Sequence, residues 1–265
     1  MTVFLNVKKE DMKLLIDHGL GLDKTKTKYE IMRLRGSCVA ILFTSGKLLI
    51  QGSDVNVSRY RDLMIAKGFK EPTKIEYVSQ SGLFIGSDES LKGDTFGGLV
   101  VVGVKADDVV RENLKILGVM DSKKLKDSSI PLLAQNIKKI AKVSIRNIYP
   151  EKYNQYNQTE LMNKLHKTVA DELSPGTHVV DKYPGCNVGD IAVTKGESKY
   201  VEIAAASIIA RDEALSQIGD LSNKLGFDIP KGSTHVKSAL ELLKKSGKDP
   251  NQFIKMHFKN IKPYF

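Results

Sequence analysis

Cysteine is scarce in this chain of 265 residues: Cys38 and Cys186 lie far apart and form no Cys-x-x-Cys pair. The five histidines also lack the His-x-x-x-His and His-x-Glu spacings of zinc ligands. Without such pairs the sequence favours free thiols in a reducing cytoplasm and argues against a zinc site. No apolar run approaches the roughly 18 residues of a membrane span, and charge interrupts the N-terminal strand too early for a signal peptide. We therefore expect a cytoplasmic protein.

Acidic residues are outnumbered, with 31 Asp and Glu against 41 Lys and Arg and a formal net charge of +10. A basic balance of this size indicates a polyanionic partner such as nucleic acid or anionic membrane, or else a lysine-rich surface that faces only water. The hydrophobic fraction of 41% is that of ordinary globular chains, so a sizeable core can form. Internal repeats are absent, and the length allows one large domain or two modest ones.

Residues 1–75 predict a small α+β domain with a curved antiparallel sheet and helices on one face. Short glycine-bearing connections between its strands are typical of hairpins. Counted to Gln80, this part has 14 Lys and Arg against 9 Asp and Glu, a net charge of +5 (14 − 9). We expect strands at Val3–Val7, Tyr29–Leu34, Cys38–Phe43 and Lys47–Gln51, helices near Lys9–His18 and Ser58–Lys67, and a polar loop through Thr27.

The stretch Pro72–Gln80 predicts a linker, which we place at residues 76–81. From residue 82 to residue 265 strands alternate with helices, and this alternation predicts an α/β domain with a mixed sheet. We expect strands at Leu83–Asp88, Gly98–Lys105, Val143–Ile148, His178–Asp181 and Ile191–Thr194, and helices near Asp127–Lys142, Glu151–Leu173, Tyr200–Leu215 and Ser233–Ser246.

The segment Ile85–Asp94 is the most informative in the chain. An apolar run is followed by the adjacent carboxylates Asp88 and Glu89 and then by a Ser/Lys/Gly loop. The apolar run Leu99–Val104 comes next. Burying carboxylates at a strand end is costly unless a metal or a positive group compensates them, and Mg²⁺ uses such hard oxygen ligands in phosphodiester chemistry. A polar strand end that faces water explains this decapeptide equally well.

Two further acids occupy similar positions. Asp181 ends the apolar strand Thr177–Asp181, and Glu197 lies in the charged turn Lys195–Lys199 before a helix rich in small residues. Asp181 alone could cap a turn, and Glu197 alone could favour a helix N-terminus electrostatically. Three such sites in one α/β domain favour a shared metal site.

Five segments in the same order resemble the type 2 ribonucleases H, and the resemblance covers residues 82–260. The glutamate at position 197 and the N-terminal block resemble the HIII branch, whose members carry an extension similar to the TATA-box-binding fold. The matching segments are Asp88-Glu-Ser-x-Lys-Gly-Asp94, Leu117–Leu125, Lys195-Gly-Glu-Ser-Lys199, Ala204–Arg211 and His257-Phe.

The resemblance implies a ribonuclease H-like mixed sheet flanked by helices, and hydrolysis of the RNA strand of RNA/DNA hybrids with two divalent ions, Mg²⁺ or Mn²⁺. Products would carry 5′-phosphate and 3′-hydroxyl ends, and we expect a monomer. The implied metal-binding and catalytic residues are Asp88, Glu89, Asp181 and Glu197. The implied substrate-binding residues are Ser90, Leu91, Lys92, Gly93, Ser122, Lys123 and Lys199.

Two positions depart from the family patterns. Leu91 replaces the first glycine of a Gly-x-Gly loop that reads the 2′-hydroxyl, and we expect its side chain to lean outward. Ser233 stands where the HII branch has a tyrosine that stacks at an RNA–DNA junction, which favours cleavage within ribonucleotide runs. The alternatives are a junction ribonuclease that excises embedded ribonucleotides, and a hybrid-binding protein with attenuated catalysis.

Overall fold

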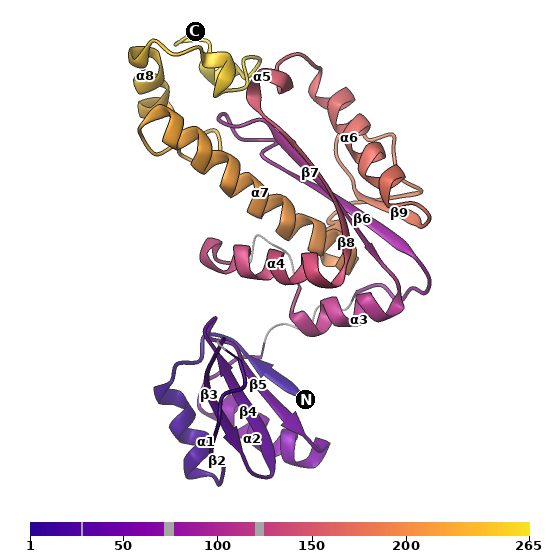
Figure 1. Ribbon diagram of the computed structural model, residues 1–265, viewed down its shortest axis with the longest axis vertical. Helices are drawn as coiled ribbons and strands as arrows, with labels where there is room; N and C mark the ends of the chain where they lie inside the picture. The colour runs from indigo at the N-terminus through magenta and orange to yellow at the C-terminus, as the bar shows by residue number, and fades with distance from the viewer. Residues whose placement is uncertain (28, 72–76, 120–124) are drawn as a thin grey trace. The chain divides into compact units, whose positions relative to one another are not determined.

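The computed structural model describes residues 1–27, 29–71, 77–119 and 125–265. The chain divides into two compact units, Met1–Lys74 and Ile75–Phe265. Each unit has its own five-stranded sheet and its own hydrophobic core (Figure 1). Among the described residues, no helix is long and apolar enough to cross a membrane. The predicted fold class, an α/β part with a mixed sheet preceded by a small α+β part, is confirmed.

The first unit has an antiparallel sheet in the order β1-β5-β4-β3-β2. Its core joins one face of the sheet, including Leu34, Ala40 and Ile50, to residues of two helices, including Leu15 and Tyr60. The helices therefore cover one face only, as predicted. The elements are β1 (Thr2–Phe4), α1 (Lys13–Asp17), β2 (Gly21–Asp23), β3 (Glu30–Arg35), β4 (Cys38–Phe43), β5 (Leu48–Gly52) and α2 (Asp54–Ala66).

The prediction missed β2, which lies within the stretch assigned to a polar loop. Gly21, Leu22 and Asp23 pair with the end of β3. A three-residue edge strand with a glycine and an aspartate carries almost no local strand signal, because both residues are depleted in strands. Only the pairing partner makes it a strand.

The second unit has a mixed sheet in the order β10-β9-β6-β7-β8. The first three of these strands run parallel, and β7 and β8 are antiparallel to their neighbours. The elements are β6 (Phe84–Ser90), β7 (Leu99–Ala106), α3 (Asp108–Leu117), α4 (Ile130–Ile140), β8 (Lys142–Ile148), α5 (Pro150–Tyr153), α6 (Gln158–Leu173), β9 (Thr177–Asp181), β10 (Ile191–Val193), α7 (Val201–Leu225) and α8 (Lys237–Ser246).

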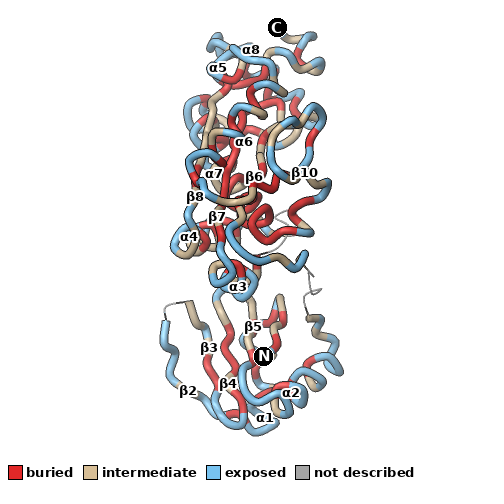
Figure 2. The backbone as a smooth tube through the Cα atoms, turned by 90° about the vertical axis from the view of Figure 1, so that its right-hand side faces the viewer, coloured by how far each residue is buried: buried red, intermediate tan, exposed pale blue. Residues whose placement is uncertain are grey.

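Helices cover both faces of this second sheet (Figure 1). Val100, Val102 and Val104 of β7 pack with α4 and α7, whereas Leu99 and Val101 pack with α6. The alternation follows from the strand period of two, which sends successive side chains to opposite faces. Figure 2 shows the resulting burial along β6, β7 and α7.

Helix α7 lies against β6 because Gly86 has no side chain. A Cβ at this position would come within 2.4 Å of the Glu202 carbonyl carbon and the Ile203 nitrogen. The run Ala204-Ala-Ala206 on the helix is small as well and is fully buried. Small residues on both elements therefore let the helix backbone approach the strand, next to the position of Asp88.

Three helices differ from the predicted ones. Helix α3 was missed, although Asp107 accepts a hydrogen bond from the Val110 N–H as its N-cap and Gly118 ends it with φ of 80°. The predicted helix over residues 151–173 is two helices, with Asn157 capping the second. Helix α7 continues ten residues past the predicted end at Leu215, to Leu225.

Residues in the stretch predicted as a linker hydrogen-bond to the second unit. The Val78 N–H donates to the Lys199 carbonyl at 2.8 Å, and the Tyr77 hydroxyl donates to the Val119 carbonyl at 2.9 Å. The Gln80 amide donates to both carboxylate oxygens of Glu202, at 2.9 and 3.0 Å. This short segment is therefore part of the second unit's fold.

Candidate active site

Three of the four predicted carboxylates meet at one edge of the second sheet. Asp88 lies near the end of β6 and Asp181 at the end of β9, and the parallel register Ser87↔Val180 places them side by side on one face. Glu197 belongs to the 3₁₀ turn Gly196–Ser198, just before α7. One carboxylate oxygen from each residue lies within 4.8 Å of the others. We call Asp88, Asp181 and Glu197 the acid group.

The turn that contains Glu197 packs closely against the end of β9. The Gly196 N–H donates to Asp181 Oδ1 at 2.7 Å. A Cβ on Gly196 would lie 2.6 Å from Ile203 Cδ1 and 3.3 Å from Asp181 Oδ1, so a larger residue would push the turn outward. Glycine at this position therefore sets the distance between Glu197 and Asp181.

Burial and mutual repulsion raise the pKa values of two members of the acid group, Asp88 and Asp181. Burial, with the charges of Glu89 and Asp181, raises the pKa of Asp88 well above its usual range, despite a hydrogen bond from Ser207. Burial also raises the pKa of Asp181 to about 6, with the neighbouring carboxylates adding to the effect. Carboxylates held this close need a compensating cation. Their hard oxygen donors suit a divalent ion such as Mg²⁺ or Mn²⁺, so the donor set fits the expected metals.

Glu89 takes a different position from its neighbour. Because β6 continues to Ser90, Glu89 is a strand residue opposite Val101 and leaves the sheet on the α6 face. Its Oε1 contacts the Lys92 ammonium, and its Oε2 lies 3.4 Å from Nε2 of the buried His166. Burial raises the pKa of Glu89, but His166 and Lys92 outweigh this and hold it below its usual value. The predicted loop position of Glu89 is therefore wrong, since the residue lies within the strand.

The orientation of the Leu91 side chain differs from the predicted one. Its backbone has φ of 66°, in the left-handed region that glycine favours. Its side chain is only 7% exposed and belongs to the core with Phe96 and Ile218, so the expected outward orientation is wrong. The leucine therefore keeps a glycine-like backbone and anchors the loop by packing inward.

Residues near the C-terminal end of the chain also hydrogen-bond to the loop after β6. The Lys255 ammonium is fully buried and donates to the carbonyls of Asp94 at 2.6 Å and Gly97 at 2.9 Å. Burial lowers the pKa of Lys255 to about 7. The Asn260 amide donates to Thr95 Oγ1 at 2.8 Å. Local sequence carries no signal for these contacts, because they join residues about 160 positions apart.

A pocket of about 510 Å³ lies over this edge of the sheet. The predicted residues Ser90, Leu91, Lys92 and Gly93 contribute to its wall. Two cations that the sequence analysis did not select, Arg211 and Lys231, line it too, and both contact Asp127. Arg211 follows Ser207 by one helical turn of α7, a spacing that could have placed both on the pocket side. The lining residues are Asp88, Glu89, Ser90, Leu91, Lys92, Gly93, Asp94, Asp181, Ser207, Arg211, Ala214, Leu215, Ile218 and Lys231.

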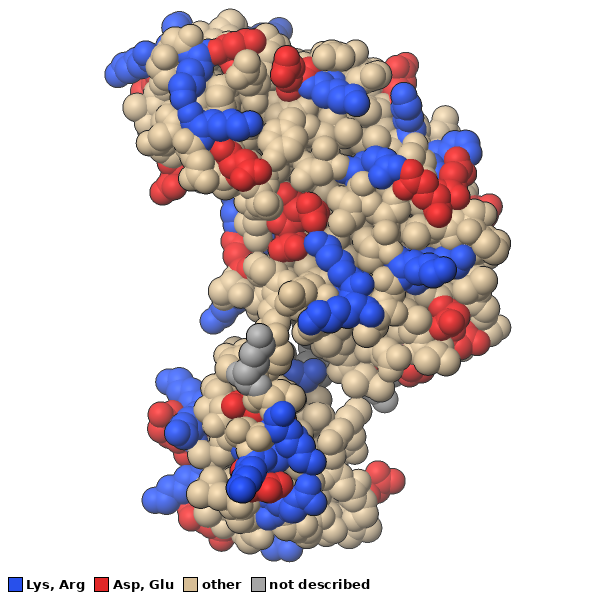
Figure 3. All heavy atoms as spheres, in the orientation of Figure 1, with Lys and Arg blue, Asp and Glu red and all other residues tan. Residues whose placement is uncertain are grey.

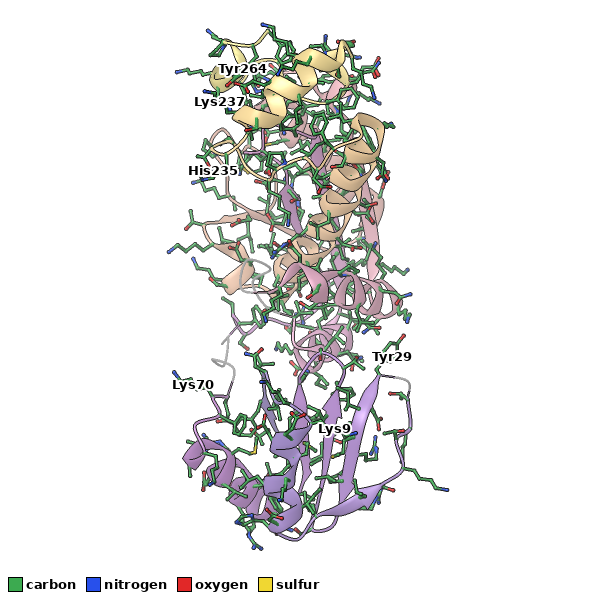
Figure 4. All side chains as sticks on the ribbon, turned by 90° about the vertical axis from the view of Figure 1, so that its left-hand side faces the viewer. Lys9, Tyr29, Lys70, His235, Lys237 and Tyr264 are labelled. Atoms are coloured by element: carbon green, nitrogen blue, oxygen red, sulfur yellow. The ribbon has the colours of Figure 1, made fainter. Side chains whose placement is uncertain are left out.

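One predicted substrate-binding residue in the described part of the chain is not brought to this pocket. Lys199 is exposed and does not line it. Ser122 and Lys123 lie outside the described residues. Two histidines of the C-terminal part do not line the pocket either: His235 is exposed at the surface before α8 (Figure 4), and His257 stacks on Tyr153 with ring centroids 5.5 Å apart.

Comparison with known proteins decides the family. The ribonuclease HII family model matches residues 85–261. Ribonuclease HIII of Bacillus cereus strain AH187 is 30% identical over 298 residues, covering 97% of this chain and 94% of that protein. The chain belongs to the type 2 ribonucleases H, in the ribonuclease HIII branch. The resemblance inferred from the sequence motifs is thereby confirmed, and the enzyme is a ribonuclease H, which acts on RNA/DNA hybrids.

Solved structures of the HIII branch share the whole fold. The crystal structure of Aquifex aeolicus RNase H3 is 27% identical with a TM-score of 0.58, covering 97% of this chain and all of that one. The crystal structure of Bst-RNase HIII in complex with Mn²⁺ is 24% identical with a TM-score of 0.61, covering 98% of this chain and 96% of that one. This enzyme therefore has both parts of the HIII architecture.

In this ribonuclease H the segment that contains Ser233 lies beside the loop after β6. The Gly232 N–H donates to Asp94 Oδ1 at 2.6 Å, and the Thr95 N–H donates to the Gly232 carbonyl at 3.0 Å. The Asn260 amide also donates to the Ser233 carbonyl at 2.9 Å. The segment is thus tied to the loop that lines the pocket, and Lys231 extends from it into the pocket wall.

Proposed function

We propose that this enzyme cleaves the RNA strand of RNA/DNA hybrids with two divalent ions, Mg²⁺ or Mn²⁺, held by Asp88, Glu89, Asp181 and Glu197. The observation that carries the proposal is the acid group, whose oxygens lie within 4.8 Å of one another and of which Asp88 and Asp181 line the pocket. Glu89 lines the same pocket from the other side of β6. Four carboxylates match the charge of two dications that also contact a phosphate.

The bound ions would supply an activated water and stabilise the leaving 3′ oxygen, which gives 5′-phosphate and 3′-hydroxyl products. The chain's own groups position the substrate around this chemistry. Lys92, Arg211 and Lys231 are cations on the pocket wall and are suited to phosphates of the cleaved strand. The backbone of residues 90–93 is suited to the 2′-hydroxyl, because Leu91 keeps the left-handed φ that a glycine would have.

The first unit would bind the hybrid through the sheet face that its helices leave open. The register aligns Val3, Leu49, Ile41 and Arg33 across that face, with Val39 beside Arg35 in the next row. None of these apolar side chains belongs to the unit's core cluster. Lysine and arginine side chains are spread over the unit's surface (Figure 3). On this face Arg33 is paired with Glu30 and Arg35 with Asp23. The face therefore offers apolar area to a nucleic-acid groove, and the phosphates would meet the lysines and arginines of the surrounding surface.

Cleavage within ribonucleotide runs is favoured over excision of single ribonucleotides. Ser233 cannot stack on a base, and its segment is fastened beside the pocket loop. We also propose that the enzyme acts as a monomer in the cytoplasm. One chain supplies the whole acid group and pocket, and its two cysteines are free thiols.

One set of assays tests this proposal. Labelled RNA/DNA hybrid, double-stranded DNA and a duplex with a single ribonucleotide are incubated with Mg²⁺, Mn²⁺ or EDTA. We expect cleavage of the hybrid only, dependent on the metal, with 5′-phosphate ends. Preferred cleavage of the single-ribonucleotide duplex would establish the junction activity instead. Hybrid binding without cleavage in either metal would establish attenuated catalysis.

A further inference from the structure

A line of buried polar side chains runs beneath β6, on the face opposite the acid group. Ser87 of β6 and His166 of α6 are 0% exposed, and His178 of β9 is 7% exposed. Apolar residues of α6, β7 and β9, including Leu165, Val101 and Val180, belong to the same core. Polar groups at such positions are costly unless each one is hydrogen-bonded.

The three side chains connect to one another and end at Glu89. Ser87 Oγ lies 2.7 Å from His178 Nε2 and 2.8 Å from His166 Nδ1. His166 Nε2 then faces Glu89 Oε2 at 3.4 Å. These last two atoms are buried, and neither has a hydrogen-bond partner within 3.5 Å of good geometry among the described residues. The end of the line is therefore directed at a carboxylate that lines the pocket.

With a neutral His166, the donors and acceptors allow one consistent direction along this line. An ionised Glu89 only accepts, so His166 must carry its hydrogen on Nε2. His166 Nδ1 then accepts from the Ser87 hydroxyl, whose oxygen accepts from His178 Nε2–H. Burial lowers the pKa of His178 to about 4, so its ring is neutral with a single N–H, as this direction requires.

The second carboxylate oxygen of Glu89, Oε1, contacts Lys92, which in turn lies against the Tyr183 ring. The Lys92 ammonium contacts Oε1 and lies 5.7 Å from the centre of the Tyr183 ring. That ring tilts against His166 at a centroid distance of 5.1 Å, and its hydroxyl donates to Asn163 Oδ1 at 2.9 Å. The carboxylate thus has one defined contact for each oxygen.

We propose that the chain His178–Ser87–His166 is a positioning device that orients the Glu89 carboxylate toward the pocket and thereby sets the metal affinity of the site. The inference rests on the proposed role of Glu89 as a metal ligand. These residues touch no substrate and act only through Glu89. Groups that orient a metal ligand from behind contribute about 10- to 100-fold to metal affinity.

Two substitutions at position 166 separate orientation of Glu89 from filling of the core. The amide of a glutamine reaches the position of Nε2 and can still donate to Glu89, whereas an asparagine reaches only the position of Nδ1. We expect His166→Asn to weaken Mn²⁺ binding by about 10-fold or more, measured by calorimetry without substrate. His166→Gln should restore affinity to within about threefold of the wild type. The KM for the hybrid should stay unchanged in both variants, with the loss appearing in kcat at fixed Mn²⁺.

Ser87→Ala tests the middle of the line, with Ser144→Ala as the matched control. Ser144 is also a buried strand serine, and its hydroxyl donates to Glu172 at 2.6 Å, away from the pocket-lining residues. We expect about a tenfold loss of Mn²⁺ affinity for Ser87→Ala only. If both variants lower the melting temperature equally and leave Mn²⁺ affinity unchanged, the line is structural and the inference is wrong.

Glu89→Gln distinguishes failure of this inference from failure of the proposed function. If Glu89→Gln keeps both Mn²⁺ affinity and hybrid cleavage, Glu89 is no ligand and the proposed assignment fails. If Glu89→Gln loses both while His166→Asn and Ser87→Ala keep both, the assignment holds and only the positioning role is overturned.

Discussion

The two sheets of this enzyme differ in what covers them. The sheet of the second unit has helices on both faces, and the acid group lies at one of its edges between β6, β9 and the turn before α7. The sheet of the first unit has helices on one face, and its other face carries Val3, Leu49 and Ile41 in one row. A covered sheet can hold charges in a low-dielectric environment, where each interaction is strong.

Under the proposed function, the two parts have separate tasks. In the covered sheet, burial first and the neighbouring carboxylate charges second raise the pKa values of Asp88 and Asp181. Without a bound cation, a site of this kind lowers the stability of the folded protein. The same closely placed carboxylates select a cation as their ligand. The first unit offers an open apolar sheet face and lysine and arginine side chains elsewhere on its surface, which suit binding of a long polyanion rather than chemistry. The predictions below test this division.

The largest expected effect is the loss of cleavage in Asp88→Asn. Removing one charged ligand should lower kcat by about a thousandfold, or ~4 kcal/mol in the activation barrier. Without metal the same variant should melt at a higher temperature than the wild type, because a buried, repelled charge is gone. Hybrid cleavage assays and metal-free thermal melts check both parts. Near-normal turnover in Mg²⁺ would remove Asp88 from the proposed site.

Deletion of residues 1–74 should act on binding instead. We expect the hybrid Kd to rise about 10- to 100-fold and the salt dependence of binding to become shallower, because fewer phosphates are neutralised. The value of kcat at saturating hybrid should change far less, since the first unit contains none of the four carboxylates. Affinity titrations at several salt concentrations measure this. An unchanged Kd and salt slope would make the first unit a folding or partner-binding element.

The pH dependence of metal-free stability should separate two groups of the covered sheet. The folded pKa of Asp181, about 6, exceeds its ordinary 3.8, so its contribution is present at low pH and lost as pH rises through 6. The folded pKa of His178, about 4, lies below its ordinary 6.5, so its contribution is present above pH 6.5 and lost as pH falls toward 4. Between pH 4 and 6.5, the contributions of Asp181 and His178 therefore change the free energy of unfolding in opposite directions.

Asp181→Asn removes only the first of these contributions. The free energy of unfolding of this variant should therefore fall more steeply from pH 6.5 to pH 4 than that of the wild type. In the variant the His178 contribution acts alone, and it amounts to up to about 3 kcal/mol. Urea unfolding in EDTA at several pH values checks this. Parallel curves for the two proteins would show that Asp181 ionises as an ordinary exposed carboxylate.

The smallest expected effect is that of Leu91→Gly. Losing the packed leucine costs about 2–3 kcal/mol, and relief of its positive φ returns about 1–2 kcal/mol, so stability should fall by about 1 kcal/mol. Cleavage should change by less than about tenfold, because the backbone already has a glycine-like conformation. Leu91→Ala is the matched variant, since it loses the packing and keeps the strain. A large gain in cleavage for the glycine variant would favour the attenuated-enzyme alternative.

Strand positions were predicted well wherever the apolar pattern was long. The strands β4 and β7 and the core of α7 have continuous apolar sequence, and Asp88 and Asp181 were identified because they end such runs. Short elements with weak patterns, such as β2, could not be predicted, because only their partner strand stabilises them. Arg211 and Lys231 were missed as pocket residues because their contact with Asp127 joins distant parts of the chain.

The sequence by itself determined the α/β class, the two-part organisation of the fold, the family and the carboxylates to consider, because these depend on local pattern and on motif order. Only the tertiary structure decided that Asp88 and Glu89 face opposite sides of β6, that Leu91 packs inward, and that His166 and His178 meet at Ser87. The reason is physical. Strand pairing and helix packing bring together side chains 79 and 91 positions apart, and no local pattern records which distant partner satisfies a buried polar group.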